Sequence, residues 1–224
     1  MAACSLVIET STPRASIALA DTDGHVETRS FCSDRNHNAM LFEPLRELLD
    51  GRPRPEIALV LVGSGPGSYS GTRVGIAAAQ GVAIAMGCPA VAVPSVLAVP
   101  PVGETMRCLA IGDARRGSYW HASINGFDMP QPPALCDASE LESIVSKAVG
   151  DGGTVFSFEE PTRFPLCPDL IHHINQEFPG APKLWRVWLA ASDETRRMWT
   201  AAIPQPLYLK PPHITPSKRP SFIG

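Results

Sequence analysis

Short apolar segments separated by polar turns open the chain. The segments are Ser5–Glu9, Ala15–Ala20 and His25–Phe31, and the turns between them are Thr10–Pro13 and Asp21–Gly24. Segments of this length that follow one another across short turns are typical of neighbouring antiparallel strands. The pattern therefore predicts a three-stranded antiparallel meander at the start of the chain.

The stretch Ile57–Met86 has the strongest pattern in the sequence. Ile57–Val62 is a continuous apolar run, which is typical of a strand buried on both faces. The run is followed by Gly63–Gly71, a loop rich in glycine and serine, and then by Thr72–Met86, which is rich in Ala, Val and Ile and predicts a buried helix. A strand, a glycine loop and a helix N-terminus in this order present backbone N–H groups to an anion or to a tightly packed partner.

The glycine loop matches no standard phosphate-binding motif. Thr72 and Arg73 follow Gly71 where a Walker loop needs Lys and then Ser or Thr, and the spacing is not that of GxGxxG. A tight connection that needs positive φ angles explains the glycines equally well. From the residues alone, phosphate binding and a purely structural turn both stay open.

One predicted helix, at 34–50, precedes this stretch, and the other, at 72–86, belongs to it. Residues 34–50 carry Leu41, Leu45 and Leu48 at helical spacing, with Pro44 inside the pattern, where it should kink the helix or mark its first turn. The 72–86 helix contains glycines at 75 and 81, each of which costs roughly 1 kcal/mol relative to alanine. Close packing against a neighbour, in the core or on a partner, is therefore expected to compensate for them.

The second half of the chain has a weaker pattern. Arg107–Asp113 and Ser118–Ile124 predict a second β-hairpin, whose turn carries two arginines that could meet a phosphate or a carboxylate or simply be solvated. The other expected elements are strands at 90–93, 154–158 and 205–209, and helices at 139–149, 169–177 and 190–202. Ser139 is the expected N-cap of the first of these helices, with Glu142 completing a capping box. Residues 211–224 hold four prolines and predict an unstructured or partner-docked tail.

Composition narrows the function. A net charge of −3, a pI near 6.1 and a hydrophobic content of 44% predict a globular chain with a real core and no strongly basic nucleic-acid surface. The six cysteines form no CxxC pair, and His37 has no second histidine at the spacing of a metal site. No secretory leader and no membrane span are recognisable, so a cytoplasmic protein without a bound metal is expected.

Several strings of the first half resemble the TsaB (YeaZ) family of bacterial proteins. The matching strings are Ile8–Thr12, His37 with Leu41–Leu49, Gly63–Gly81, Asp113–Arg115 before Tyr119–Trp120, and Pro206–Leu209. The resemblance covers residues 4–124 well and the remainder thinly, and the glycine string is its most specific part.

The resemblance implies an α/β, actin-like (ASKHA, ribonuclease H-like) fold with two subdomains. The implied units are an N-terminal subdomain at 1–102, a smaller, reduced or divergent subdomain at 103–209 and a proline-rich tail at 210–224. It also implies a non-catalytic scaffold or activator subunit of the complex that forms N6-threonylcarbamoyladenosine at position 37 of tRNA. The implied partners are a catalytic TsaD-like paralogue and a TsaE-like ATPase, with tRNA reached only through the complex and a homodimer as a possible isolated form.

Two departures from the family pattern bear on these expectations. Position 9 is Glu, where the family usually shows Asp, and the longer carboxylate makes independent ATP hydrolysis a poorer expectation. Residues 150–200 follow the family poorly, so the second subdomain is expected to be reduced or rebuilt.

The candidate site residues fall into two groups. The expected partner interface comprises Leu41, Leu45, Leu48, Val74, Gly75, Ala78, Gly81 and Val82. The expected vestigial phosphate loop comprises Thr10, Ser11, Thr12, Gly65, Gly67 and Ser68. No catalytic residue, metal or resident cofactor is expected, with ATP or ADP at most a weak ligand at the partner interface.

The alternatives are an independent ATPase or small-molecule kinase of the same fold, with Thr10–Thr12 and Gly65–Gly71 as phosphate loops, and a metalloprotease, which the missing histidine pair disfavours.

Overall fold

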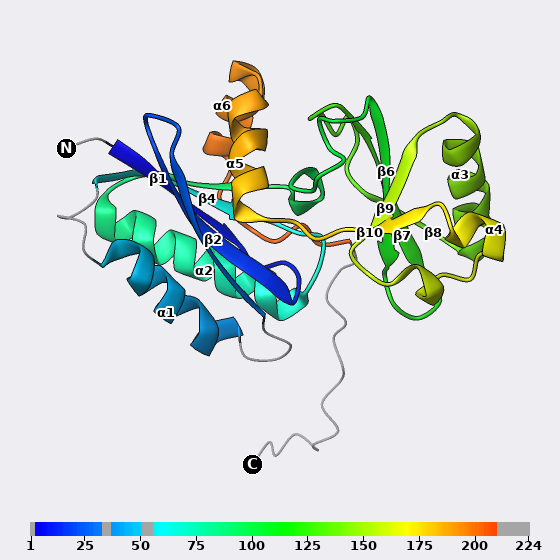
Figure 1. Ribbon diagram of the computed structural model, residues 1–224, viewed down its shortest axis with the longest axis horizontal. Coiled ribbons are helices and arrows are strands. Elements are labelled where there is room, and N and C mark those ends of the chain that lie inside the picture. Colours follow the sequence, from blue (N-terminus) through cyan, green and yellow to red (C-terminus); the bar gives the residue numbers. More distant parts are fainter. Residues whose placement is uncertain (1–2, 33–36, 51–55, 210–224) are drawn as a thin grey trace, which may run out of the picture.

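Two five-stranded sheets lie side by side in the computed structural model, which describes residues 3–32, 37–50 and 56–209 (Figure 1). The predicted tail at 210–224 lies outside these residues. The first sheet has the order β3-β2-β1-β4-β5. Its strands are β1 (Ala3–Glu9), β2 (Arg14–Asp21), β3 (Val26–Cys32), β4 (Glu56–Gly63) and β5 (Ala90–Val93). The predicted meander is confirmed, since β1, β2 and β3 pair antiparallel.

The second sheet repeats the topology of the first. Its order is β10-β9-β6-β7-β8, with antiparallel pairing of β6, β7 and β8 and parallel pairing of β6, β9 and β10. The strands are β6 (Arg107–Asp113), β7 (Tyr119–Asn125), β8 (Ala134–Cys136), β9 (Thr154–Ser157) and β10 (Ile174–Gln176). In the first sheet β4 lies parallel to β1, and in the second sheet β9 lies parallel to β6, the equivalent strand. This duplication confirms the expected actin-like fold with two subdomains.

The crossover connections show how the second subdomain is reduced. In the first sheet, α2 (Tyr69–Met86) joins β4 to β5 with 18 helical residues. The equivalent connection between β9 and β10 holds only η2 (Pro161–Arg163) and α4 (Pro168–Ile171), a helix of four residues. By contrast α3 (Ala138–Gly150) and α1 (His37–Leu49) occupy matching positions with 13 residues each. The sheet is therefore retained, and one covering helix is shortened.

Helices α1 and α2 cover one face of the first sheet (Figure 1). Leu41, Leu45 and Leu48 of α1 pack with Ile76 and Ala79 of α2 in one buried cluster that also contains side chains from β1, β2 and β4. The leucine spacing that predicts α1 therefore reflects the core of the chain, and Pro44 lies inside the helix without ending it.

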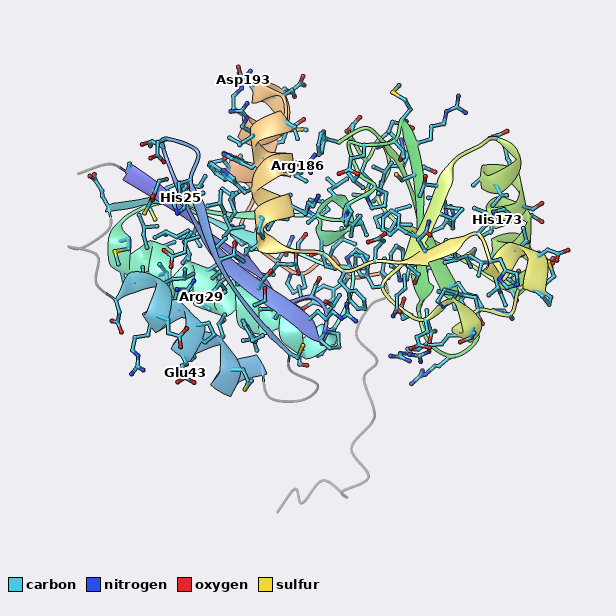
Figure 2. All side chains as sticks on the ribbon, in the orientation of Figure 1. His25, Arg29, Glu43, His173, Arg186 and Asp193 are labelled. Carbon is cyan, nitrogen blue, oxygen red and sulfur yellow. The ribbon has the colours of Figure 1, made fainter. Side chains whose placement is uncertain are left out.

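The opposite face of the first sheet is covered by the end of the chain. Helices α5 (Ala181–Ala190) and α6 (Asp193–Ala201) return to this face and lie against the first sheet. The sequence analysis had placed these residues in the second subdomain, at 103–209. Arg186 projects from α5 and, with Lys183, meets Glu104 in the connection between the sheets at 3.6 Å (Figure 2). At the foot of α5, Gly180 N donates to Ala98 O at 3.0 Å.

One hydrophobic cluster joins the two subdomains. It contains Val7 and Leu61 from the first sheet, Ala110 and Phe156 from the second, and Leu184 from α5, all of them fully buried. Helix α5 is held against the first sheet where Ala181 N donates to the buried Ser16 Oγ at 2.9 Å. Because these side chains share one apolar core, separating the subdomains would expose it to water.

Some elements differ from the sequence predictions. The expected helix at 190–202 is α6, which begins at Asp193, whereas α5 was not among the expected elements. The expected helix at 169–177 is α4 followed by β10. The stretch 205–209 is not a strand, because Pro204 and Pro206 supply no N–H donor and only Leu207 N bonds to Ser64 O. The cap of α3 is Asp137 with Glu140, not Ser139 with Glu142. A short 3₁₀ turn, η1 (Ser95–Leu97), follows β5.

Truncation of a side chain should lower stability strongly on the inner side of α1 and hardly at all on its outer side. Leu48 is 1% exposed, and Leu48→Ala should lower the free energy of unfolding by about 2–5 kcal/mol because it leaves a cavity in the core. Phe42 is 61% exposed, and Phe42→Ala should change stability by less than about 0.5 kcal/mol. Urea denaturation followed by circular dichroism measures both, and equal losses would contradict the assignment of the leucine face to the core.

Candidate functional site

The hydroxyl-rich turn after β1 lies beneath the glycine loop. Thr10 Oγ1 donates to Gly71 O at 2.8 Å, and Ser68 N donates to Ser11 O at 2.6 Å. Thr10, Ser11 and Thr12 are all buried. The structure thus brings the turn and the loop, 50 residues apart in sequence, into direct contact.

Three glycines make this contact possible. A Cβ atom at Gly67 would overlap Ser11 O, one at Gly75 would overlap Thr10 Oγ1, and one at Gly63 would overlap the Glu9 carboxylate. Any other residue at these positions would force the turn and the loop apart. The glycines of the string therefore serve packing within the chain.

Several backbone N–H groups of the glycine loop, which the sequence pattern indicated as possible anion donors, form hydrogen bonds within the chain. Gly65 N donates to Ser95 Oγ at 3.0 Å, Gly71 N donates to Ser68 Oγ at 3.2 Å, and Ser64 N donates to Val93 O at 2.9 Å. Thr12 Oγ1 donates locally to Arg14 O at 3.0 Å. The vestigial phosphate loop stays a prediction, with these donors committed to the fold.

Glu9 is fully buried at the end of β1. Its Oε1 accepts a hydrogen bond from Ser11 N at 2.7 Å, while its Oε2 and the nearby Ser11 Oγ have no hydrogen-bond partner among the described residues. Burial raises the pKa of Glu9, and the hydrogen bond from Ser11 N opposes that effect only in part. A proton on this carboxyl avoids the cost of an unpaired charge in the core.

The residues expected at a partner interface divide between the core and the surface. Leu41, Leu45 and Leu48 are buried in the chain's own core, and so is Gly75. Val74, Ala78 and Val82 are half-buried and pack against the same core, and Gly81 is exposed. The leucine face is therefore not available to a partner. If the chain has a partner interface here, we expect it on the outer side of α2.

The outer side of α2 carries an apolar stripe, of which the sequence analysis named Gly81 but not its neighbours. Arg73, Ala77, Gly81 and Ile84 recur at helical spacing and are all exposed, Ile84 to 83%. Arg73 is the one charged residue in the 18 residues of α2. The signal in the sequence was the lack of charge on both sides of the helix, since a surface helix normally has a polar outer face.

The hairpin of the second sheet places two arginines in unusual backbone conformations. Arg115 and Arg116 have φ angles of 68° and 60°, in a region that few residues other than glycine adopt. Asp113 meets Arg115 Nη1 at 3.2 Å and Arg163 Nη2 at 3.7 Å. Burial raises the pKa of the neighbouring Glu159, a shift that the Ser157 hydroxyl opposes. The sequence left a phosphate, a carboxylate and water open as ligands of the two hairpin arginines. For Arg115 the structure supplies a carboxylate of the same chain, that of Asp113.

The described part of the chain lacks two features. No group of three His, Cys, Asp or Glu side chains in it could hold a metal ion. None of its helices combines the length and apolarity needed to cross a membrane.

Solved structures similar to this chain define its fold class. A Pseudomonas aeruginosa protein described as similar to peptidase YeaZ matches 93% of this chain and 100% of its own, with a TM-score of 0.71 and 22% identity. YeaZ from Pseudomonas aeruginosa matches 92% of this chain and 100% of its own, with a TM-score of 0.67 and 21% identity. The chain thus has the two-subdomain, actin-like fold of these proteins.

Sequence comparisons add the family. The TsaD family model, described as tRNA N6-adenosine threonylcarbamoyltransferase, matches residues 32–127. The tRNA threonylcarbamoyladenosine biosynthesis protein TsaB of Escherichia coli K12 is 32% identical over 122 residues, which span 51% of this chain and about half (52%) of that protein. These two matches support a relation to the TsaB/YeaZ family over about half of the chain.

The two glycines inside α2 provide a matched pair of substitutions. Gly75→Ala should lower the free energy of unfolding by about 1–3 kcal/mol, because the new Cβ overlaps Thr10 Oγ1. Gly81→Ala should raise it by up to about 1 kcal/mol, because nothing lies within 4 Å of the new Cβ and alanine favours a helix. Thermal unfolding of both variants measures the difference, and stabilisation by Gly75→Ala would refute the close packing of α2 on the turn.

Glu9 should make stability depend on pH. Because burial raises the folded-state pKa above that of the unfolded chain, the folded state holds more protons between the two values. The contribution of Glu9 is therefore fully present below the unfolded pKa and is lost as pH rises through the folded pKa. Glu9→Gln removes this dependence, so the free energy of unfolding of the variant relative to the wild type should increase with pH over that interval.

Denaturant titrations at a series of pH values measure this effect. Glu43→Gln is the control for the loss of one carboxylate, since Glu43 lies on the outer side of α1, away from the sheet (Figure 2). Parallel pH profiles for the wild type and Glu9→Gln would show that the Glu9 carboxyl does not hold the proton assigned to it.

Proposed function

We propose that the chain is a non-catalytic accessory subunit of the complex that forms N6-threonylcarbamoyladenosine at position 37 of tRNA. In this role it binds and stabilises a catalytic TsaD-like paralogue, and a TsaE-like ATPase and the tRNA join through the complex. The match to Escherichia coli TsaB over half of that protein, and the match of residues 32–127 to the TsaD family model, support the reaction to which the chain contributes.

The outer stripe of α2 is the observation that carries the accessory role. Ala77, Gly81 and Ile84 expose small and aliphatic groups on a helix whose inner side is already buried by the sheet. A helix that is apolar on both sides is stable when both sides are covered. On the neighbouring helix α1, Met40 and Phe42 are also exposed, to 42% and 61%. The α1–α2 outer face, defined by Arg73, Ala77, Gly81, Ile84, Met40 and Phe42, therefore fits a protein partner.

Small residues in this stripe indicate how a partner would pack. At Gly81 nothing lies within 4 Å of a built Cβ, and Ala77 is exposed four residues earlier. Without long side chains between them, two helices can approach to the lower end of the usual interaxial distance of about 8–10 Å. A paralogue with the same fold presents its own pair of helices at the equivalent place, and a four-helix contact follows. A second copy of this chain could use the same face in the absence of the partner.

The closed turn and loop support the absence of catalysis by this subunit. Thr10 Oγ1 donates to Gly71 O, Ser11 N donates to Glu9 Oε1, and Ser68 N donates to Ser11 O. Glu9 is sealed beneath Gly63 and Ser95. A phosphate group of ATP would have to displace these contacts to reach the carboxylate, so any nucleotide is expected to bind weakly and at the partner interface.

Charge placed on the outer stripe should abolish the complex without unfolding the chain. Ala77→Glu introduces a carboxylate that a packed helix interface would have to bury, which should weaken binding of the TsaD-like paralogue at least roughly tenfold. Ser146→Glu, on the exposed side of α3 in the second subdomain, is the matched control. Pull-down and calorimetric titration with the purified paralogue measure binding, and circular dichroism checks the fold.

The same pair of variants tests the reaction. In cells, Ala77→Glu should lower the threonylcarbamoyladenosine content of tRNA, measured by mass spectrometry of digested tRNA, and Ser146→Glu should not. Normal modification in a strain that lacks the chain, or an Ala77→Glu variant that binds as well as the wild type, would count against the proposal.

A further inference from the structure

An arginine held between two tyrosines stands at one end of the α1–α2 outer face. The Arg73 guanidinium lies 3.8 Å from the centre of the Tyr69 ring, and its Nε and Nη2 donate to Tyr208 Oη at 3.0 and 2.7 Å. The two tyrosine rings are 6.4 Å apart and are themselves 61% and 50% exposed. The cluster is thus ordered by its own contacts while remaining open to solvent.

The C-terminal segment 203–209 supplies one of the two tyrosines. Gln80 Nε2 of α2 donates to Pro204 O at 3.2 Å, and Leu207 N donates to Ser64 O at 2.8 Å. These bonds fix the segment along α2 between Arg73 and Gln80 and so place Tyr208 beside Arg73. The segment therefore contributes to the outer face that α1 and α2 form.

Arg73 keeps unused hydrogen-bonding capacity. A guanidinium has about five N–H groups, of which Tyr208 takes one on Nε and one on Nη2. The two on Nη1 and the second on Nη2 remain, and together they form the end-on fork that binds a carboxylate through two parallel bonds. No carboxylate pairs with Arg73 within residues 3–32, 40–50 and 56–209.

We propose that the Tyr69–Arg73–Tyr208 cluster is the anchor of the interface on α2, and that it binds an Asp or Glu side chain on the facing helix of the TsaD-like paralogue. This inference rests on the proposed function and adds the chemistry of the contact. Tyrosine and arginine are enriched among the residues that dominate the binding energy of protein interfaces. The stacked, tethered guanidinium has lost side-chain freedom before binding, which lowers the entropic cost of the contact.

A carboxylate fits this site better than the phosphates of a nucleic acid. Phosphate-binding surfaces gather several basic side chains along one face. The outer stripe of α2 has one cation, followed by Ala77, Gly81 and Ile84. A single buried ion pair surrounded by apolar contacts fixes the register and orientation of a protein partner.

Affinity for the purified TsaD-like paralogue, measured by calorimetry at low and high ionic strength, tests the anchor. Arg73→Ala should weaken binding roughly 10- to 100-fold and reduce the salt dependence of the affinity. Arg73→Lys should recover only part of the affinity, since an ammonium lacks the planar fork. Tyr208→Phe, which keeps the ring and removes the hydroxyl that holds Arg73, should cause a smaller loss, as expected of a positioning residue. Arg107→Ala, an exposed arginine of β6, is the control and should bind as the wild type does.

Charge exchange identifies the partner group. Arg73→Asp should abolish binding, and an Asp or Glu changed to Arg on the partner's facing helix should restore it. Unchanged affinity of Arg73→Ala in a chain that does bind the paralogue would overturn the anchor and leave the proposed function standing. No binding by the wild-type chain would overturn both. An effect of Arg73→Ala on self-association or on tRNA binding alone would assign the cluster to a different partner and so refute it.

Discussion

The close contact between the turn after β1 and the glycine loop is the constraint on which the first subdomain depends. Thr10 and Ser11 fill the space that Cβ atoms at Gly75 and Gly67 would otherwise occupy. The contact fixes the N-terminus of α2 against β1, because Thr10 Oγ1 bonds to Gly71 O at the first turn of that helix. The position of α2, and with it the exposed outer stripe, therefore follows from atoms buried beneath the helix.

A second constraint holds the two subdomains together. The duplicated topology leaves each sheet with one face turned toward the other subdomain, and one apolar cluster fills the space between them. Leu184 and Val187 of α5 belong to this cluster, so the returning end of the chain completes it. Because α5 and α6 end beside the first sheet, the segment 203–209 is delivered to α2 rather than to the second subdomain. The same core thus determines where Tyr208 lies.

Local pattern predicted most of the fold, and the errors have physical reasons. Apolar runs identified β1, β2, β4 and β5, because strands buried on both faces carry the strongest signal. The pattern did not predict α5, a helix of 10 residues that begins among Pro179, Gly180 and Pro182, residues that usually mark a turn. The candidate site was predicted less well. Helical spacing marks a buried face without saying whether the chain itself or a partner buries it, so Leu41, Leu45 and Leu48 were assigned to an interface and lie in the core.

The two glycines of α2 show how one helix meets both demands. Gly75 faces inward, and its missing side chain admits Thr10. Gly81 faces outward, where no atom of the described chain needs its space, so packing within the subunit gives no reason for it. A glycine that costs about 1 kcal/mol in a solvated helix position is explained when a second helix approaches it. The inner side of α2 thus accounts for the resemblance to a nucleotide-binding loop, and the outer side accounts for a subunit that acts through a partner.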